Sequence, residues 1–596
     1  MRQERETIRI CRRALQRVIT FCALLAWAAP ASAADPPRDL AGLWAAKLRF
    51  GPDLRGPLTI ERSGGAWTAD IAGRRAAVVA DGERLSFELE NGEGGFRGRM
   101  VSRPRPARIE GHWIQPPMVT AGSRYATPIV LEPLGADRWR GDVAPLEDAF
   151  TYFLPIRRDS SGTLIAWLGN PERNLGRFMR VERVEFDGKT VRLEGRPSRS
   201  APMQAIAEGP YSEEDDTFSL PLRGGTCDFH RATAADEEVF RPRGRGTGPW
   251  VYRRPSAEND GWPVASLDEA GISRETLAPF VQMLIDMPMD SLSAQQIHGM
   301  LIARNGKLVL EEYFHGFHRE RLHDTRSAAK SITSFLVGAA MQSGIRVSPA
   351  TRVYEVMGSP ASFAALEPRK RALTLENLLT MASGLDIDDS DEKSVGNEET
   401  MTDQQEQPDW YRYTLDLKAV RDPGEKAVYG SASPNLAGGV LAKASGRWLP
   451  ELFQSLVAGP LQIRHYAMNL QPGGEAYMGG GAQLTLRDFL KFGQVMIDGG
   501  RWHGQQIVSP AWATKSTSRL FEIGKDGYGY LWWVTDLPHQ GRTVRAFYAG
   551  GNGGQVVMGI PELHLVVGFF GGNYADNVMF NTQRVYVPKY ILPAVR

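Results

Sequence analysis

The chain has 596 residues, 42% of them hydrophobic, and 70 Lys and Arg balance 69 Asp and Glu to a formal net charge of +1. This balance gives no reason to expect nucleic acid as a partner, and the length predicts more than one domain. Three of the ten histidines cluster, His315, His318 and His323, but without cysteines or carboxylates at metal-ligand spacing. We therefore expect no metal and no cofactor.

The first segment is typical of a secretory signal. Arginines are followed by an apolar stretch at residues 18–29 and by Ala31-Ser32-Ala33, which is a small-residue cleavage site. We expect residues 1–34 to be removed on export to the periplasm or beyond, leaving no integral membrane segment. Cys11 and Cys22 leave with the signal, so Cys227 stays alone and is expected to be a buried thiol outside any internal disulfide.

Residues 35–240 predict an all-β accessory domain. Short alternating runs at residues 58–62, 84–89, 108–113 and 190–194 are separated by Gly, Asp and Pro turns. A small barrel or a sandwich accounts for this pattern. Residues 241–259 open with a Pro-, Gly- and Arg-rich run, which we interpret as a solvated linker.

From residue 260 to the end, helical patterns mix with strand patterns, which predicts an α+β domain. Ser327 and Lys330 stand at the head of an apolar run that stops at Gly344. Residues three apart share a helix face, so the lysine amine can reach the serine hydroxyl. A lysine whose ammonium is disfavoured by burial can take the proton of a serine nucleophile.

A second Ser-x-x-Lys, Ser390 to Lys393, lies in an acidic stretch with no apolar helix behind it, and we interpret it as a loop. The stretch belongs to a long insertion, residues 384–410, that is rich in Asp, Glu and Gln. Loops of this length either cover a site or lack a fixed structure. The sequence leaves open whether the insertion forms a lid.

Two more segments follow the serine. Tyr429-Gly430-Ser431 comes after a turn signal and before a helical pattern, where an exposed tyrosine can enter a cleft. Near the C-terminus, residues 548–555 are glycine-rich and lead into a strand. Such glycines either let backbone N–H groups approach an oxyanion or simply form a hairpin turn.

With these segments, residues 260–596 resemble the serine beta-lactamase and penicillin-binding-protein superfamily, and within it the class C-like esterases and 6-aminohexanoate-dimer hydrolases. The resemblance also rests on residues 299–309, 378–385, 479–488 and 528–533. It implies a beta-lactamase/transpeptidase-like fold, an antiparallel sheet with helices, after the all-β domain.

The resemblance implies roles for individual residues. Ser327 becomes the acylated nucleophile, Lys330 its proton acceptor and Tyr429 a second proton-transfer group, while the N–H groups of Ser327 and Gly551 form the oxyanion hole. The substrate-binding residues that it suggests are Ser431, Tyr548, Gly550, Asn552, Trp532 and Trp533.

This sequence departs from the family pattern in two places. The family's Tyr-x-Asn is here Tyr429-Gly430-Ser431, and its Lys-Thr-Gly is Tyr548-Ala549-Gly550. The second departure removes a usual carboxylate-holding lysine, so we expect uncharged or amine-bearing substrates to be preferred unless another cation replaces it.

The sequence thus predicts an exported serine hydrolase that cleaves a small-molecule ester or amide through an acyl-enzyme. One alternative is a penicillin-binding DD-peptidase-like protein or a sensor that acylates without turnover. Another is a cell-wall- or carbohydrate-binding protein that acts through its β domain. Because every proposed catalytic group follows residue 260, we expect that part to work alone.

Overall fold

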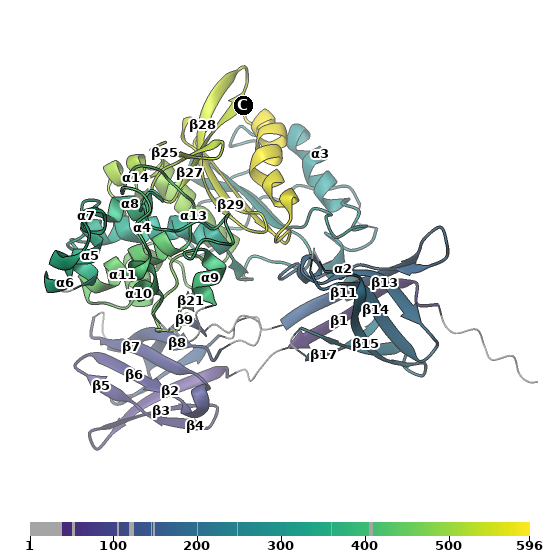
Figure 1. Cartoon of the computed structure of the whole chain (residues 1–596), viewed down its shortest axis with the longest axis horizontal. Coiled ribbons are helices and arrows are strands. Elements are labelled where there is room, and N and C mark those ends of the chain that lie inside the picture. Colours follow the sequence, from purple (N-terminus) through teal and green to yellow (C-terminus); the bar gives the residue numbers. More distant parts are fainter. Residues whose placement is uncertain are drawn as a thin grey trace, which may run out of the picture.

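The computed structural model describes residues 39–49, 54–103, 106–117, 124–144, 146, 149–198, 201–223, 225–246, 248–358, 360–403 and 409–596. The predicted signal segment lies outside these residues. In Figure 1 a body of helices and sheet, formed by the C-terminal part of the chain, stands above two separate β units formed by the N-terminal part. The predicted α+β organisation, with an all-β region first, is confirmed.

The first β unit is a closed antiparallel barrel. Its first strand, β1, pairs with β11 along its whole length and with β17 on the other side, which closes the ring. Alternate side chains point inward, and Trp44, Phe218 and Phe229 are fully buried in its core. The barrel strands are β1 (Gly42–Arg49), β11 (Ala149–Arg158), β12 (Leu164–Ile165), β13 (Arg180–Phe186), β14 (Thr190–Arg196), β15 (Gln204–Ser212), β16 (Thr217–Leu222) and β17 (Gly225–Arg231).

The second β unit is inserted between the first two strands of the barrel. Nine strands form one antiparallel sheet in the order β4-β3-β2-β10-β9-β8-β7-β6-β5, with its own apolar core around Phe96 and Trp113. The predicted single β domain is therefore two units, one nested in the other. The sheet strands are β2 (Gly56–Ser63), β3 (Ala66–Ile71), β4 (Arg74–Ala77), β5 (Val79–Asp81), β6 (Arg84–Glu88), β7 (Gly95–Val101), β8 (Arg108–Ile114), β9 (Arg124–Pro133) and β10 (Arg138–Val143).

The predicted linker is not a free spacer, and this expectation was wrong. Arg243 forms an ion pair with Glu312, and the Trp250 indole N–H donates to the same carboxylate at 2.8 Å. Arg241 and Arg245 both pair with Glu237 of the short helix α2 (Ala234–Phe240). The arginines of the run pair with carboxylates outside it, with Arg241 and Arg245 sharing Glu237, so the run is held against α2 and the domain that follows.

The C-terminal domain is built on an eight-stranded antiparallel sheet in the order β19-β18-β30-β29-β28-β27-β26-β25. Its first strand by sequence, β18, pairs with β19 on one side and with β30, the last strand of the chain, on the other. The strands are β18 (Ile297–Arg304), β19 (Lys307–Tyr313), β25 (Phe521–Ile523), β26 (Asp526–Tyr528), β27 (Trp533–His539), β28 (Arg542–Gly551), β29 (Gln555–Ile560) and β30 (Leu565–Gly571).

Helices cover both faces of this sheet, with α3 (Arg274–Ile285) and the C-terminal helical segment (Thr582–Ile591) against one core and the larger helical cluster against the other. The helix that begins after Ser327, α4 (Ala329–Gln342), is buried over most of its length, and Gly344 behind it has φ of +88°. The other helices are α3 (Arg274–Ile285), α5 (Val353–Met357), α6 (Pro360–Ala365), α7 (Pro368–Ala372), α8 (Leu375–Leu379), α9 (Glu398–Thr402), α10 (Trp410–Asp416), α11 (Ala432–Ser445), α12 (Leu449–Phe453), α13 (Leu486–Ile497) and α14 (Pro510–Ser516).

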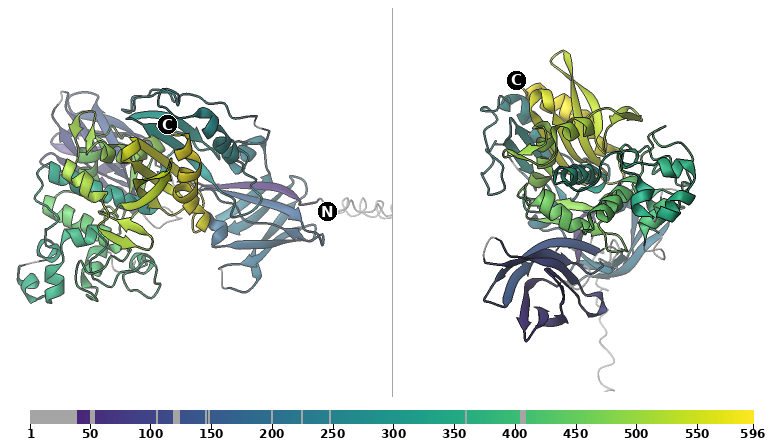
Figure 2. Two further views of the ribbon diagram at one scale, coloured as in Figure 1. Left: turned by 90° about the horizontal axis from the view of Figure 1, so that it is seen from above. Right: turned by 90° about the vertical axis from the view of Figure 1, so that its left-hand side faces the viewer.

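The nested sheet and the C-terminal domain share a strand pair. Strand β21 (Tyr466–Leu470) pairs with β9 in register, Met468 opposite Ala126 and Leu470 opposite Arg124. Across the same junction the Tyr466 hydroxyl lies 2.8 Å from Nε2 of His112. Short strands β20 (His323–Asp324) and β22 (Ala482–Leu484) extend this sheet, and β23 (Arg501–Trp502) and β24 (Gln505–Gln506) form a separate hairpin. The views in Figure 2 show the N-terminal β units lying against the C-terminal domain.

Candidate active site

The predicted serine and lysine meet at the start of α4. Ser327 lies in a short 3-10 turn, η3 (Arg326–Ala328), that runs directly into the helix. Lys330 Nζ donates a hydrogen bond to Ser327 Oγ at 2.9 Å. The lysine is only 1% exposed, whereas the serine is half-buried and lines a cavity. The three-residue spacing thus gives the contact expected from the sequence.

The charge of Lys330 differs from the expectation. Burial disfavours its ammonium and is the largest single effect, but Tyr429, Glu398 and Asp389 together raise the pKa of Lys330 above its ordinary value. The Tyr429 ring centroid lies 5.0 Å from Nζ. In the resting protein Lys330 is therefore a cation that donates to Ser327, rather than a neutral amine.

Tyr429 is held by aromatic contacts on a tight loop before α11. Its ring stacks on Trp533 at 5.5 Å and meets the edge of Tyr528 at 6.4 Å. The next residue must be small, because a Cβ at Gly430 would lie 2.1 Å from a methyl carbon of Ile387. The loop therefore presses against the acidic insertion, and this contact fixes the position of the phenol.

Asp389 of the insertion ties these pieces together. One of its oxygens accepts hydrogen bonds from Ser431 N at 2.8 Å and Ser431 Oγ at 2.7 Å, and the other accepts from Glu398 N at 3.0 Å. Burial, with the nearby Glu398 carboxylate, outweighs the attraction of Lys330 and raises the pKa of Asp389 to about 6. A carboxyl group that titrates near neutrality thus lies beside the Ser327–Lys330 pair.

The glycine-rich segment is the end of strand β28, and it packs against the serine turn. A Cβ at Gly551 would lie 2.3 Å from the Thr325 carbonyl oxygen and 3.1 Å from Ala328 N. Only glycine permits this approach of the strand to the turn. Asn552 is exposed, lines the same cavity as Ser327, and accepts a hydrogen bond from Ala575 N through its side-chain oxygen at 2.8 Å.

Several predicted substrate-binding residues do not face the cavity. Trp532 is fully buried in the helical core, Ser431 is fully buried and donates to Asp389, and Tyr548 is 5% exposed with its hydroxyl bonded to Asp526. Their side chains are enclosed by the fold, so these three expectations are corrected. Trp533, which stacks on Tyr429, and Gly550 are half-buried and lie outside the lining of the cavity.

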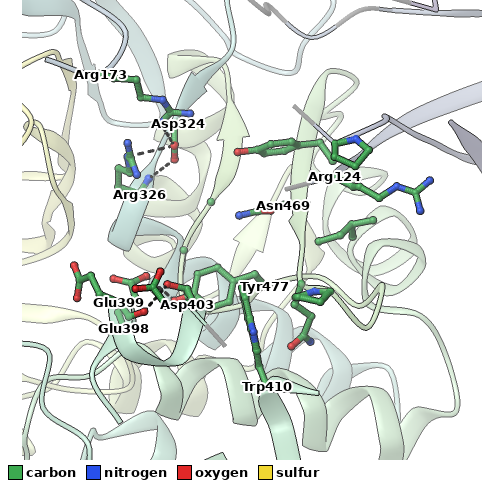
Figure 3. Close-up of a pocket in the computed structure, with 18 of the residues that line it drawn as sticks. Arg124, Arg173, Asp324, Arg326, Glu398, Glu399, Asp403, Trp410, Asn469 and Tyr477 are labelled. Carbon is green, nitrogen blue, oxygen red and sulfur yellow. Dashed lines mark hydrogen bonds and ion pairs between the residues drawn. The ribbon is translucent and has the colours of Figure 1, made fainter. Parts of the chain in front are cut away.

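The cavity beside Ser327 has a volume of about 660 Å³ and is formed by both halves of the chain. The C-terminal domain contributes the serine turn, the acidic insertion and the segment from Asn469 to Gly481. The nested sheet contributes Arg124 and Tyr125, and the barrel contributes Arg173 and Phe178. Figure 3 shows residues of each group, among them Arg124, Arg173 and Asn469, around this cavity. The N-terminal part of the chain is thus a wall of this cavity.

The described part of the acidic insertion forms another wall. Glu398, Glu399 and Asp403 line the cavity from α9 and the residue after it, and Glu398 accepts a hydrogen bond from the Tyr477 hydroxyl at 2.6 Å. Ser390, by contrast, is exposed and bonds to Asp388, which agrees with its interpretation as a loop residue. Residues 404–408 lie outside the described part.

Sequence reasoning missed the carboxylates and arginines of the site. Asp389 and Glu398 lie in the acidic insertion, for which a lid over the site was considered, but no local signal pointed these two residues at Lys330. Arg173 is 151 residues from its partner Asp324.

Among the described residues, no group of three or more His, Cys, Asp or Glu side chains has the arrangement of a metal site. No described helix has the length and apolar composition needed to cross a bilayer.

The chain is similar to several known proteins. Over 256 residues the chain is 26% identical to the 6-aminohexanoate-dimer hydrolase of Paenarthrobacter ureafaciens, covering 39% of this chain and 63% of that protein. A solved penicillin-binding protein homologue from Caulobacter crescentus is 15% identical to this chain and has a TM-score of 0.40. The match covers 51% of this chain and 93% of the homologue. The hydrolase EstCE1, described as having promiscuous acyltransferase activity, is 17% identical, with coverages of 54% and 97% and a TM-score of 0.41.

The family model described as beta-lactamase matches residues 275–576, which is just over half of the chain. The match contains the serine turn, the acidic insertion, the Tyr429 loop and strand β28. The chain therefore belongs to the beta-lactamase family of hydrolases.

Proposed function

We propose that this protein is an exported serine hydrolase that cleaves ester or amide bonds of small substrates through an acyl-enzyme on Ser327. The observation that carries the proposal is the 2.9 Å contact between Lys330 Nζ and Ser327 Oγ at the edge of a cavity of about 660 Å³. A nucleophile, a charged partner and space for a small molecule are together in one place.

In the proposed first step, Ser327 Oγ attacks the substrate carbonyl carbon and its proton passes to the Lys330–Tyr429 pair. Because Lys330 is already charged, its ammonium stabilises the developing negative charge, and the pair must first give up one proton to accept that of Ser327. The N–H groups of Ser327 and Gly551 stabilise the oxyanion. The pair then protonates the departing alcohol or amine.

In the second step, water attacks the acyl carbon, the pair accepts its proton, and Ser327 leaves as the free hydroxyl. Asp389 acts through its neighbours, holding Ser431 and favouring the charged form of Lys330. We expect the rate to rise toward alkaline pH, as the pair loses its extra proton.

A fluorophosphonate probe and a panel of p-nitrophenyl esters, ω-amino-acid amides, D-Ala-D-Ala peptides and nitrocefin test the proposal. Ser327→Ala should lose labelling and turnover together, whereas Ser390→Ala, at the exposed second Ser-x-x-Lys, should change neither. Labelling that persists in Ser327→Ala would exclude this serine. Stoichiometric labelling of Ser327 without turnover on the whole panel would favour a sensor.

Export is tested separately. We expect the protein purified from the periplasm or medium to begin near residue 35, as N-terminal sequencing would show. A full-length chain retained in the cytoplasm would contradict export without bearing on the chemistry.

A further inference from the structure

Two arginines and one aspartate form an ion cluster beside Ser327. Arg173 Nη1 lies 2.6 Å from Asp324 Oδ2, and Arg326 Nε lies 3.3 Å from the same oxygen. The other Asp324 oxygen accepts a hydrogen bond from the backbone N–H of Arg326 at 2.9 Å. All three residues line the cavity (Figure 3). Two guanidinium groups share one carboxylate, so the cluster carries a net charge of +1.

This charge persists over the working pH range. Burial opposes ionisation of Asp324, but Arg326 and Arg173 outweigh it and hold the pKa of that carboxyl at about 2. Both guanidiniums are permanent cations. The excess positive charge is therefore a fixed property of the cavity wall.

Arg326 presents this charge to the cavity. It directly precedes Ser327, has φ of +51°, and its guanidinium lies over the Tyr574 ring at 5.0 Å. The side chain is 36% exposed. Within the described residues its terminal nitrogens Nη1 and Nη2 form no hydrogen bond, so both remain available to a ligand. Arg173, which reaches the cluster from the barrel, is less exposed and stands behind Asp324.

The remainder of the cavity orients a charged ligand. Glu398, Glu399 and Asp403 lie together on a different wall from Arg173 and Arg326 (Figure 3). An anionic group entering the cavity is repelled by the acidic wall and attracted to the arginines beside the nucleophile. Next to the nucleophile, the arginine side of the cavity therefore favours the anionic end of a substrate, and the acidic side disfavours it.

We propose that Arg326, supported by Arg173 from the N-terminal barrel, holds a carboxylate of the substrate next to Ser327. The inference rests on the proposed hydrolase function and adds a substrate class to it. The position of the family's Lys-Thr-Gly lysine is occupied here by Tyr548, which is buried. The cation that replaces it comes from the residue before the nucleophile, with a partner from a different domain.

The test compares two esters that differ only at one end. These are p-nitrophenyl pentanoate, which ends in a methyl group, and mono-p-nitrophenyl glutarate, which ends in a carboxylate. We expect the ratio of kcat/KM for the anionic ester to that for the neutral ester to fall at least about tenfold in Arg326→Gln, as loss of a charge-assisted hydrogen bond predicts. Arg326→Lys should retain part of the preference, since the charge remains.

Arg173→Gln should lower the same ratio, because Asp324 then neutralises Arg326. The control is Arg177→Gln on the same barrel loop, whose side chain pairs with Asp576 at 3.2 Å outside the cavity. We expect that variant to leave the ratio unchanged. A general loss of folding would lower the rates for both esters and leave their ratio as it was.

Free glutarate supplies a second readout that needs no turnover. Isothermal titration calorimetry should detect binding of glutarate to the Ser327→Ala variant. The double variant Ser327→Ala, Arg326→Gln should bind it at least about tenfold more weakly. The inference would be overturned if neither the kcat/KM ratio nor the glutarate affinity changed in Arg326→Gln and Arg173→Gln. The proposed function would still stand in that case if ester hydrolysis depended on Ser327. Glutarate binding without any hydrolysis would uphold the subsite and reject the hydrolase.

Discussion

Replacing Asp389 by asparagine tests the electrostatics of the site most directly. Its carboxyl group has a pKa of about 6 in the folded protein against 3.8 ordinarily. For an acid with a raised folded pKa, the unfolded chain ionises first as the pH rises. The folded state therefore pays a penalty that is absent below pH 3.8, grows between pH 3.8 and 6, and is complete above it.

This displacement corresponds to a penalty of about 3 kcal/mol at pH 7 and about 1.6 kcal/mol at pH 5. Asparagine abolishes the penalty and keeps an acceptor for Ser431, but it loses the acceptor for Glu398 N, at a cost of about 1 kcal/mol. Because the side chain is only half-buried, solvent screening reduces the gain further. We expect Asp389→Asn to raise the free energy of unfolding by about 1–2 kcal/mol at pH 7 and by about 0.5 kcal/mol or less at pH 5.

Urea denaturation at the two pH values measures this difference. Asp388→Asn is the matched control, because the carboxylate of Asp388 bonds the exposed Ser390 and is not among the groups that raise the pKa of Lys330. Asp389→Asn should also move the alkaline rise of the rate to lower pH, since the group that favours the Lys330 ammonium is gone. A variant that is no more stable than the parent at pH 7, or whose gain is the same at pH 5, would refute the reasoning.

Three further changes probe other parts of the molecule. Tyr429→Phe keeps the stacking on Trp533, so we expect kcat to fall by about 10²-fold with unchanged thermal stability; a near-normal kcat would make Tyr429 a packing residue. A chain shortened to residues 260–596 loses the β9 partner of β21 and one cavity wall, so fluorophosphonate should label Ser327 more slowly than in the full chain; an undiminished rate would show that the N-terminal part is dispensable. Burial lowers the pKa of His112 to about 3, whereas an unfolded histidine is protonated near pH 6.5, so its contribution to stability is lost as the pH falls below 6.5. Between pH 7 and pH 5 the free energy of unfolding of His112→Gln, measured by urea denaturation, should therefore fall by about 2 kcal/mol less than that of the parent. An equal fall in both proteins would exclude His112 as the cause.

What the sequence could predict was set by distance along the chain. Ser327 and Lys330 are three residues apart, so helix geometry alone brings them together, and the turn residues around Gly430 mark the Tyr429 loop. The contact of Arg173 with Asp324 has no local signature, because no pattern in either segment indicates that the two residues lie close together in the fold. The pairing of Arg243 with Glu312 is likewise distant in sequence, whereas Arg241 and its partner Glu237 are only four residues apart.

Two errors have a simpler origin. Trp532 and Trp533 were both expected near the substrate, but adjacent residues of an extended chain point to opposite sides, so only one of them could face Tyr429. For Lys330, burial or neighbouring cations were expected to disfavour the ammonium, whereas the groups that surround it are acidic. The acidic residues that raise its pKa lie 59 and 68 residues later in the sequence, and the fold places them beside it.

The nesting of one β unit in the other makes the inner unit replaceable. The chain leaves the barrel after Arg49 and returns at Ala149, and these two residues pair across β1 and β11. A short turn between them would join β1 and β11 as an ordinary hairpin, so the barrel strands do not need the inserted sheet in order to pair. Any substitute has to offer a strand edge to β21, because Met468 and its neighbours pair with β9. Exchange of this unit would reshape one wall of the cavity while leaving the serine turn as it is.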